Sequence, residues 1–188
     1  MKRIFFTGFV ICVAVFIVII MDSIQRDVYS KSATSNEIKA AFLIKFTDFI
    51  KWPDTAFESN PDSFVLGILG MNIFHHLLDP FIGKSIQGRK FMIRHYKGMA
   101  EVSSISNVQI LFVSHSEVPH YQEIFNQLNT HGILTISDRP EFIRHGGTIA
   151  FVKRGNRIGF EINRVSEKRA GLKISSDLLQ LATRVYTK

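Results

Sequence analysis

The sequence has almost no cysteine. Among its 188 residues the only one is Cys12, which lies inside an apolar run near the N-terminus. One cysteine cannot form an intramolecular disulfide, which excludes the disulfide framework that stabilises many small secreted proteins. The rest of the chain must therefore be stabilised by core packing alone, which a domain of this size can supply.

Short motifs that reveal a catalytic or metal centre are also missing. The seven histidines form no H-E-x-x-H pattern or comparable set of closely spaced ligands. Ser114-His115-Ser116 lacks the flanking glycines of a nucleophile elbow, and the acidic residues are scattered. We therefore expect no catalytic residue, no metal and no cofactor, although a triad can assemble from residues far apart in the sequence.

A long apolar run is present at the N-terminus. The segment from Ile4 to Met21 contains no charged residue, and as a helix it would extend about 27 Å, nearly the thickness of a bilayer core. Lys2 and Arg3 precede it, so the positive-inside rule keeps the N-terminus in the cytoplasm and sends the rest of the chain out. The pattern is compatible with a cleaved signal peptide and with a retained anchor.

The chain therefore divides into three parts. Residues 1–21 are the signal peptide or membrane anchor, with membrane contact through residues 4–21. Residues 22–34 are polar and serine-rich, as in a linker, and residues 35–188 have the length of one ordinary domain.

The net charge of the chain is positive. It is +7 overall, and from Asn36 onward 19 Lys and Arg stand against 14 Asp and Glu. Outside the cytoplasm such a surface favours an acidic protein partner, anionic headgroups or envelope polymers. No arginine-rich run is present, so we expect no nucleic-acid partner.

The first helix of the domain has a clear start. Thr34 and Glu37 have the spacing of a capping box, and apolar residues then recur at three- and four-residue steps to about Lys51. Pro53 disfavours helical geometry at the residue before it, so the helix should end there.

From Ser63 onward, apolar β-branched runs alternate with helical stretches, which is typical of βαβ units. The predicted strands are Phe64–Leu69, Lys90–His95, Gln109–Val113, Ile133–Ser137, Thr148–Val152 and Asn156–Ile162. The last two are separated by Arg154-Gly155-Asn156 and should form an antiparallel hairpin. The predicted helices are 73–81, 119–129, 139–145 and a final one that begins at Ser175-Ser176-Asp177 and docks Leu178, Leu181, Ala182 and Val185.

These elements predict an α/β fold with three layers. The sheet should be mixed but mainly parallel, with helices on both faces and the antiparallel hairpin near the C-terminus. In open α/β sheets, ligands bind outside the carboxyl ends of the strands. Gly70, Asn72 and Ser114 lie at two such ends and form a candidate ligand crevice, although a tight turn explains the glycines better because the dinucleotide fingerprint is incomplete.

Polar residues near the C-terminus suggest a second candidate site. Glu161 and Asn163 end the predicted hairpin, where they either satisfy the backbone of a turn or belong to a binding surface. Leu179 and Tyr186 lie off the docking stripe of the final helix and could form an exposed apolar patch.

Taken in order, several motifs resemble the YfiR family of periplasmic proteins in Gram-negative bacteria. They are Ile38-Lys39-Ala40-Ala41-Phe42-Leu43 with Trp52-Pro53, Ile110-Leu111-Phe112-Val113-Ser114, Leu134-Thr135-Ile136-Ser137-Asp138, Gly146-Gly147-Thr148-Ile149, Phe160-Glu161-Ile162-Asn163 and the segment 170–182. The resemblance covers residues 36–185. It implies a compact α/β fold, often dimeric, without known catalysis. It also implies that the protein represses a membrane-bound diguanylate cyclase by binding the periplasmic domain of that enzyme, which lowers cyclic di-GMP and biofilm formation.

The resemblance also suggests where the partner binds. The expected partner-binding residues are Glu161, Asn163, Leu172, Ile174, Leu178 and Leu179. Well-known members carry periplasmic cysteines that form disulfides and link activity to redox state, whereas this domain has none, so the resemblance does not make it a redox sensor and leaves its releasing signal open. Two alternatives remain open: a periplasmic small-molecule sensor that uses the crevice at Gly70, and a hydrolase.

Overall fold

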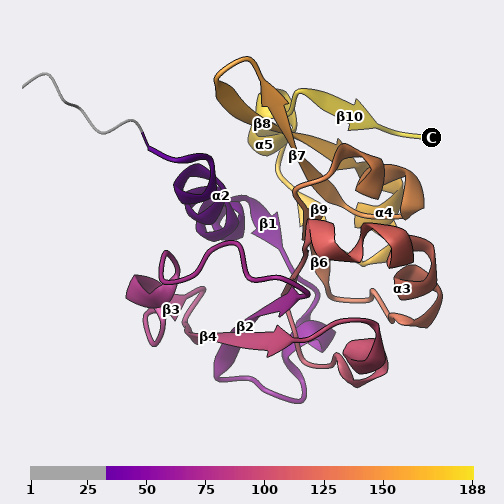
Figure 1. Ribbon diagram of the computed structural model, residues 1–188. Coiled ribbons are helices and arrows are strands. Elements are labelled where there is room, and N and C mark those ends of the chain that lie inside the picture. Colours follow the sequence, from indigo (N-terminus) through magenta and orange to yellow (C-terminus); the bar gives the residue numbers. More distant parts are fainter. Residues whose placement is uncertain (1–32) are drawn as a thin grey trace, which may run out of the picture. The chain divides into compact units, whose positions relative to one another are not determined.

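The computed structural model describes residues 33–188 (Figure 1). The expected apolar segment 1–21, and all but the last two residues of the expected linker 22–34, lie outside the described residues. Within residues 33–188, none of the helices has the length and apolar character needed to cross a bilayer.

The first described helix, α2 (Ser35–Phe49), begins at the predicted capping box. The Thr34 hydroxyl accepts a hydrogen bond from the backbone N–H of Glu37 at 3.2 Å, and the Glu37 carboxylate accepts one from the Thr34 N–H at 2.6 Å. The helix ends two residues earlier than predicted. Ile50 and Lys51 are extended and form β1 (Ile50–Lys51), which pairs antiparallel with β9 (Lys173–Ile174).

The main sheet has eight strands in the order β10-β8-β7-β6-β5-β2-β4-β3. Their bounds are β2 (Ser63–Leu69), β3 (Ser85–Ile86), β4 (Arg89–Tyr96), β5 (Ile110–Val113), β6 (Leu134–Ser137), β7 (Ile149–Arg154), β8 (Arg157–Asn163) and β10 (Arg184–Tyr186). Only the β3–β4 and β7–β8 pairs are antiparallel. The predicted mixed, mainly parallel sheet and its C-terminal hairpin are confirmed.

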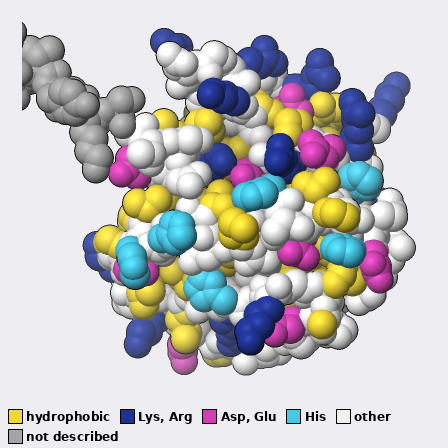
Figure 2. All heavy atoms as spheres, viewed as in Figure 1, with side chains coloured by type: hydrophobic (Ala, Val, Ile, Leu, Met, Phe, Trp, Pro, Cys, Tyr) yellow, Lys and Arg dark blue, Asp and Glu magenta, His cyan; other side chains and the backbone are white. Residues whose placement is uncertain are grey.

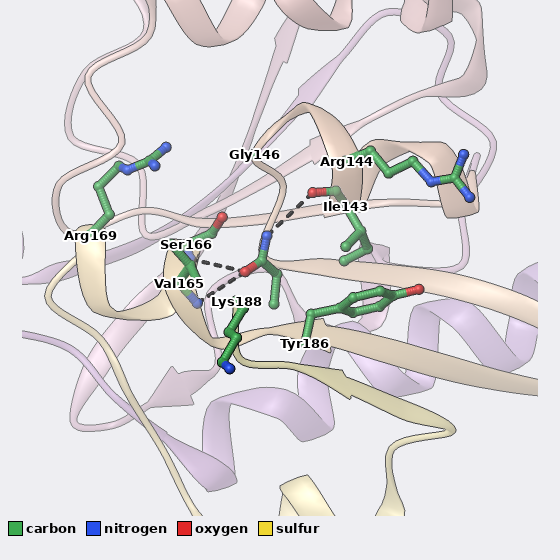
Figure 3. Close-up of a pocket in the computed structure, with 9 residues that line it drawn as sticks. Ile143, Arg144, Gly146, Val165, Ser166, Arg169, Tyr186 and Lys188 are labelled. Carbon is green, nitrogen blue, oxygen red and sulfur yellow. Dashed lines mark hydrogen bonds between the residues drawn. The ribbon is translucent and has the colours of Figure 1, made fainter.

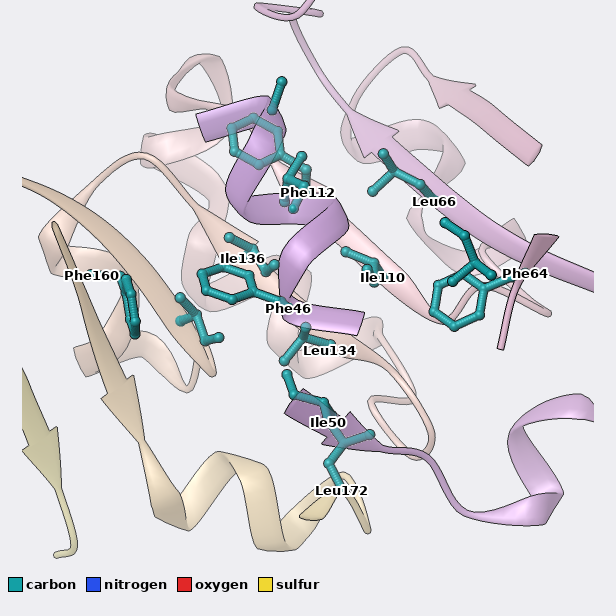
Figure 4. Packing of buried hydrophobic residues seen from close by; sticks show 14 of the residues in the cluster. Phe46, Ile50, Phe64, Leu66, Ile110, Phe112, Leu134, Ile136, Phe160 and Leu172 are labelled. Atoms are coloured by element: carbon teal, nitrogen blue, oxygen red, sulfur yellow. The ribbon is translucent and has the colours of Figure 1, made fainter. Parts of the chain in front are cut away.

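Each face of the sheet carries its own core. On one face, Leu43 and Phe46 of α2 pack against side chains of the central strands, and the Phe46 ring lies 5.1 Å from that of Phe160 (Figure 4). On the other face, Tyr121 and Ile124 of α3 (Tyr121–Gln127) belong to a separate buried cluster. Helices therefore cover both faces, and the predicted three-layer α/β fold is confirmed.

Short 3₁₀ helices of one or two turns make up many of the connections between these elements. They are η1 (Asp54–Phe57), η2 (Asp79–Phe81), η3 (Met99–Ser104), η4 (His115–His120) and η5 (Pro140–His145). Two short α-helices, α4 (Arg164–Arg169) and α5 (Ser176–Leu181), complete the described chain.

The prediction of a helix over 73–81 is wrong. The Asn72 side chain accepts a hydrogen bond from the Phe74 N–H and starts a turn, and His75 has a positive φ of 46° that a right-handed helix does not allow. Only the short turn η2 forms there. The helix predicted over 119–129 is present as α3, whereas the segment 139–145 forms the 3₁₀ turn η5.

The predicted final helix is too long. α5 ends at Leu181, whose side chain is exposed, and Val185 lies in the edge strand β10. This strand forms because the outer edge of β8 offers unpaired backbone groups, one of which, the Phe160 carbonyl, accepts the Thr183 N–H at 2.8 Å. The β-branched Thr183 and Val185 suit an extended backbone.

Tyr121 provides a pH test of the packing between α3 and the sheet. Burial raises the pKa of the Tyr121 phenol to about 12, while its hydroxyl is hydrogen-bonded to Ser137 at 2.7 Å. In the unfolded chain a phenol ionises near pH 10, whereas the folded protein keeps the Tyr121 phenol neutral to a higher pH. The stability that depends on the neutral phenol is therefore complete below about pH 10 and is lost as the pH rises toward 12. We expect a loss of about 2 kcal/mol in unfolding free energy from this group.

Denaturant unfolding of the wild type and Tyr121→Phe at pH 9 and pH 11.5 measures this effect. The variant should lose less stability over this interval because it has no phenol to ionise. Equal losses in the two proteins would contradict the assignment.

Candidate functional site

An open cleft lies where η5, α4 and the edge strand β10 meet (Figure 3). Its volume is about 410 Å³, and we call it the C-terminal cleft. It is lined by Ile143, Arg144, Gly146, Asn163, Val165, Ser166, Arg169, Tyr186 and Lys188. A smaller hollow of about 280 Å³ adjoins it, shares Arg144 and Tyr186, and includes Glu161.

Asn163 joins the segments around this cleft. Its side-chain oxygen accepts hydrogen bonds from the backbone N–H groups of Val165 at 2.9 Å and Ser166 at 3.2 Å, which caps α4. Its side-chain amide donates to the Ile143 carbonyl at 3.2 Å, at the end of η5 (Figure 3). Asn163 therefore has a structural role within the cleft, whatever else contacts it.

Glu161 begins a short polar chain along the adjacent hollow. The Tyr186 hydroxyl donates to its buried carboxylate at 2.9 Å, and the Arg184 guanidinium donates to the Tyr186 hydroxyl at 3.3 Å. The strand register places Arg184 opposite Glu161 and Tyr186 opposite Asn163. The hydrogen bond with Tyr186 and the nearby Glu161 charge raise the pKa of Arg184 above its ordinary value, so this side chain is always cationic.

The charged side chains on the wall of the C-terminal cleft are all basic. Arg144, Arg169 and Lys188 are exposed, and none of them forms an ion pair with an acidic side chain in residues 33–188. Exposed apolar area comes from Val165, and the Tyr186 ring is half-buried. This combination suits a ligand or partner segment that carries negative charge.

Three of the six expected partner-binding residues are core residues. Leu172, Ile174 and Leu178 are buried in the same cluster as Phe46, and Leu179 packs partly buried against it. They lie here because β9 pairs with β1 and brings the chain back to α2. The sequence-based expectation that these leucines and Ile174 present an apolar surface is corrected, because their side chains are buried or partly buried, whereas Leu181, farther along α5, is largely exposed.

The two polar residues of the expected partner site lie elsewhere. Glu161 and Asn163 alternate along β8 with Phe160 and Ile162, which belong to the α2-side core. Successive side chains of a strand point to opposite faces, so the two polar residues face the side of the sheet opposite to that core. The structure thus brings Glu161 and Asn163 to the C-terminal cleft and its adjoining hollow, and separates them from Leu172, Ile174 and Leu178.

The corner at Gly70, Asn72 and Ser114 is occupied by protein atoms. A side chain at Gly70 would lie 2.3 Å from the Ser116 hydroxyl, which accepts the Met71 N–H and donates to the Glu117 carboxylate. Ser114 is buried and caps η4, while Asn72 holds its own turn. A ligand at this corner remains a prediction.

Another polar cluster lies near the carboxyl ends of β5 and β6. The Asp138 carboxylate is 3.3 Å from the Lys39 ammonium and 3.6 Å from the His115 imidazole, which ties α2 to the sheet. Across residues 33–188, no three His, Cys, Asp or Glu side chains are grouped closely enough to hold a metal ion.

The sequence reasoning did not select Arg144, Arg169 or Arg184, and it placed Tyr186 on a helix. A signal for the arginines was nevertheless present. Residues 139–188 contain eleven Lys and Arg but four Asp and Glu, an excess of seven that equals the net charge of the whole chain. The uneven distribution of charge along the sequence, rather than the total charge, indicates that the basic surface is formed by residues 139–188.

Fold and cleft together define a small α/β domain with a mixed eight-stranded sheet and a basic cleft beside one edge strand. The family described as YfiR/HmsC-like matches residues 36–183, and the chain belongs to that family. This confirms the resemblance drawn from the sequence motifs.

A similar fold is found among solved structures. The described fold is similar to the crystal structure of a conserved domain protein from Vibrio cholerae O1 biovar eltor, with a TM-score of 0.55 and 9% sequence identity. The match covers 82% of this chain and 61% of that chain, so this protein spans less than two thirds of its length. None of the curated proteins matches this sequence.

Proposed function

We propose that this protein is a periplasmic regulator that restrains an inner-membrane signalling enzyme, such as a diguanylate cyclase, by binding the periplasmic part of that enzyme. The observation that carries the proposal is the family match, which extends over residues 36–183 and so includes nearly the entire described domain. The protein acts through binding rather than catalysis.

The C-terminal cleft and its adjoining hollow are the proposed contact region. They hold Glu161 and Asn163, two of the residues expected from the sequence, beside the exposed cations Arg144 and Arg169. The proposal assigns Leu172, Ile174 and Leu178 a supporting role, because their side chains are buried beneath the surface.

Two further features belong to this proposal. An uncleaved apolar segment within residues 1–21 would keep the protein at the inner membrane, where its effective concentration toward a membrane partner is higher. A homodimer, common in the family, would present two copies of the cleft to that partner.

Deletion of the gene tests the function directly. Loss of the restraint should raise cellular cyclic di-GMP several-fold and increase biofilm formation, and a plasmid copy of the full chain should restore both. Affinity capture of the full chain from solubilised membranes should recover an inner-membrane signalling enzyme. An unchanged nucleotide level together with capture of no such enzyme would contradict the proposal.

A second candidate function is a small-molecule sensor. The cleft volume of about 410 Å³ falls in the range of small-ligand sites, and its lining combines an aromatic ring, an amide and cations. A metabolite that binds the folded state should raise the melting temperature in a concentration-dependent way. Screening anionic metabolites against the full chain would distinguish this function from protein binding alone.

A further inference from the structure

The positive charge of this protein is concentrated in its last fifty residues. Residues 139–188 have an excess of seven cationic side chains, whereas residues 1–138 contain twelve Lys and Arg and twelve Asp and Glu. The greater part of the chain is therefore electrically balanced, and the entire net charge belongs to the segment that forms η5, the β7–β8 hairpin, α4, α5 and β10.

Few exposed acids offset this charge. Of the four acidic residues in the segment, Glu161 and Glu167 are buried and already paired, the first with Tyr186 and the second with Arg164 and the Ile174 N–H. Figure 2 shows that Lys and Arg side chains gather over the part of the surface where Figure 1 places the C-terminal strands. Exposed cations therefore outnumber exposed acids on the surface that residues 139–188 form.

The C-terminal cleft lies within this basic surface and has the form of a short groove. Figure 3 shows Arg169 and Arg144 at opposite ends of the view, with Val165, Ser166, Tyr186 and a third cation, Lys188, between them. Three cations around a concave site that also holds an apolar and an aromatic side chain match a peptide segment with several acidic side chains. A flat lipid surface would not reach the floor of a concave site.

We propose that the C-terminal cleft binds an acidic peptide segment of the protein partner, with Arg144 and Arg169 contacting its carboxylates. The proposal rests on the proposed regulatory function and adds the chemistry of the segment that is recognised. Because both cations are exposed, the interaction weakens as ionic strength rises. The cations of the cleft thus select a negatively charged segment, and the half-buried Tyr186 ring adds an apolar contact.

The test measures binding of a fluorescent peptide that alternates glutamate with valine to the full chain in a non-ionic detergent. The wild type should bind this peptide at low salt and should bind the matching glutamine peptide at least tenfold more weakly. The double variant Arg144→Glu/Arg169→Glu should lose at least tenfold in affinity for the glutamate peptide. Thermal unfolding should be unchanged, because both side chains are exposed.

A matched control is the double variant Lys51→Glu/Lys90→Glu, which lowers the net charge equally but alters exposed cations outside the basic segment. Its affinity should change less than threefold. An equal loss in both double variants, or equal binding of the glutamate and glutamine peptides, would overturn the proposal. So would a result in which the cleft variant loses binding to phosphatidylglycerol vesicles but keeps binding to the peptide.

The cell assay separates this inference from the proposed function. If deletion of the gene raises cyclic di-GMP but the Arg144→Glu/Arg169→Glu chain returns it fully to the wild-type level, the regulatory function is supported and the assignment of an acidic segment to the cleft fails. If deletion has no effect, the regulatory function itself fails.

Discussion

Replacing Leu178 with aspartate should unfold most of the protein, although α5 lies at the surface of the described chain. Leu178 is 2% exposed and packs in the α2-side core. The variant loses the buried leucine and places a carboxylate among apolar side chains that offer it no partner. We expect the unfolding free energy to fall by more than about 4 kcal/mol, a large part of what a domain of this size has.

Leu181→Asp is the matched control. It makes the same chemical change three residues along the same helix, but Leu181 is 66% exposed. We expect a change below about 0.5 kcal/mol, as for surface substitutions in general. Urea denaturation followed by circular dichroism measures both. A folded Leu178→Asp protein with wild-type stability would show that this side chain is not a core residue.

Replacing Phe46 with alanine should have a similarly large effect at the centre of the same core. The Phe46 ring lies 5.7 Å from that of Phe42, 6.0 Å from Phe151 and 5.1 Å from Phe160, so it links α2 to the β7–β8 hairpin. Removing it leaves a cavity with aromatic walls. We expect a loss of about 4 kcal/mol in unfolding free energy.

Ile82→Ala provides the comparison for this core substitution, because Ile82 is largely exposed in the turn before β3. Its effect should stay below about 1 kcal/mol. The midpoint of denaturant unfolding should decrease strongly for Phe46→Ala with little change in the slope of the transition. A Phe46→Ala midpoint equal to that of Ile82→Ala would contradict the packing described for α2.

These stability effects bear on how partner binding is tested. Substitutions at Leu172, Ile174 or Leu178 would abolish capture of a partner simply by unfolding the domain, so they cannot identify a contact surface. Exposed cations of the C-terminal cleft can be changed without that consequence. The distinction between the two groups follows from burial, which the sequence pattern indicated for Leu178 but not for Leu172 or Ile174.

The polar residues show a different limit of sequence reasoning. Glu161 and Asn163 were selected as an acid and an amide at the end of a strand, and both lie beside hollows in the structure. The bonds of Asn163 with Val165 and Ser166 are a local helix cap, whereas those of Glu161 with Tyr186 and of Asn163 with Ile143 depend on segments 25 and 20 residues away. Such partners follow from strand order and register, which have no local signature.

Local elements that depend on neighbouring residues could be predicted from the sequence. The capping box at Thr34, the apolar strands and the Gly155 turn were all visible there, because hydrogen bonding and backbone preference act over a few residues. Long-range packing made the chain after Leu181 the strand β10, since the open edge of β8 overrides a helical pattern there. It also decided which apolar residues are buried and gathered the separate cations around one cleft, because both depend on which distant segments pack together.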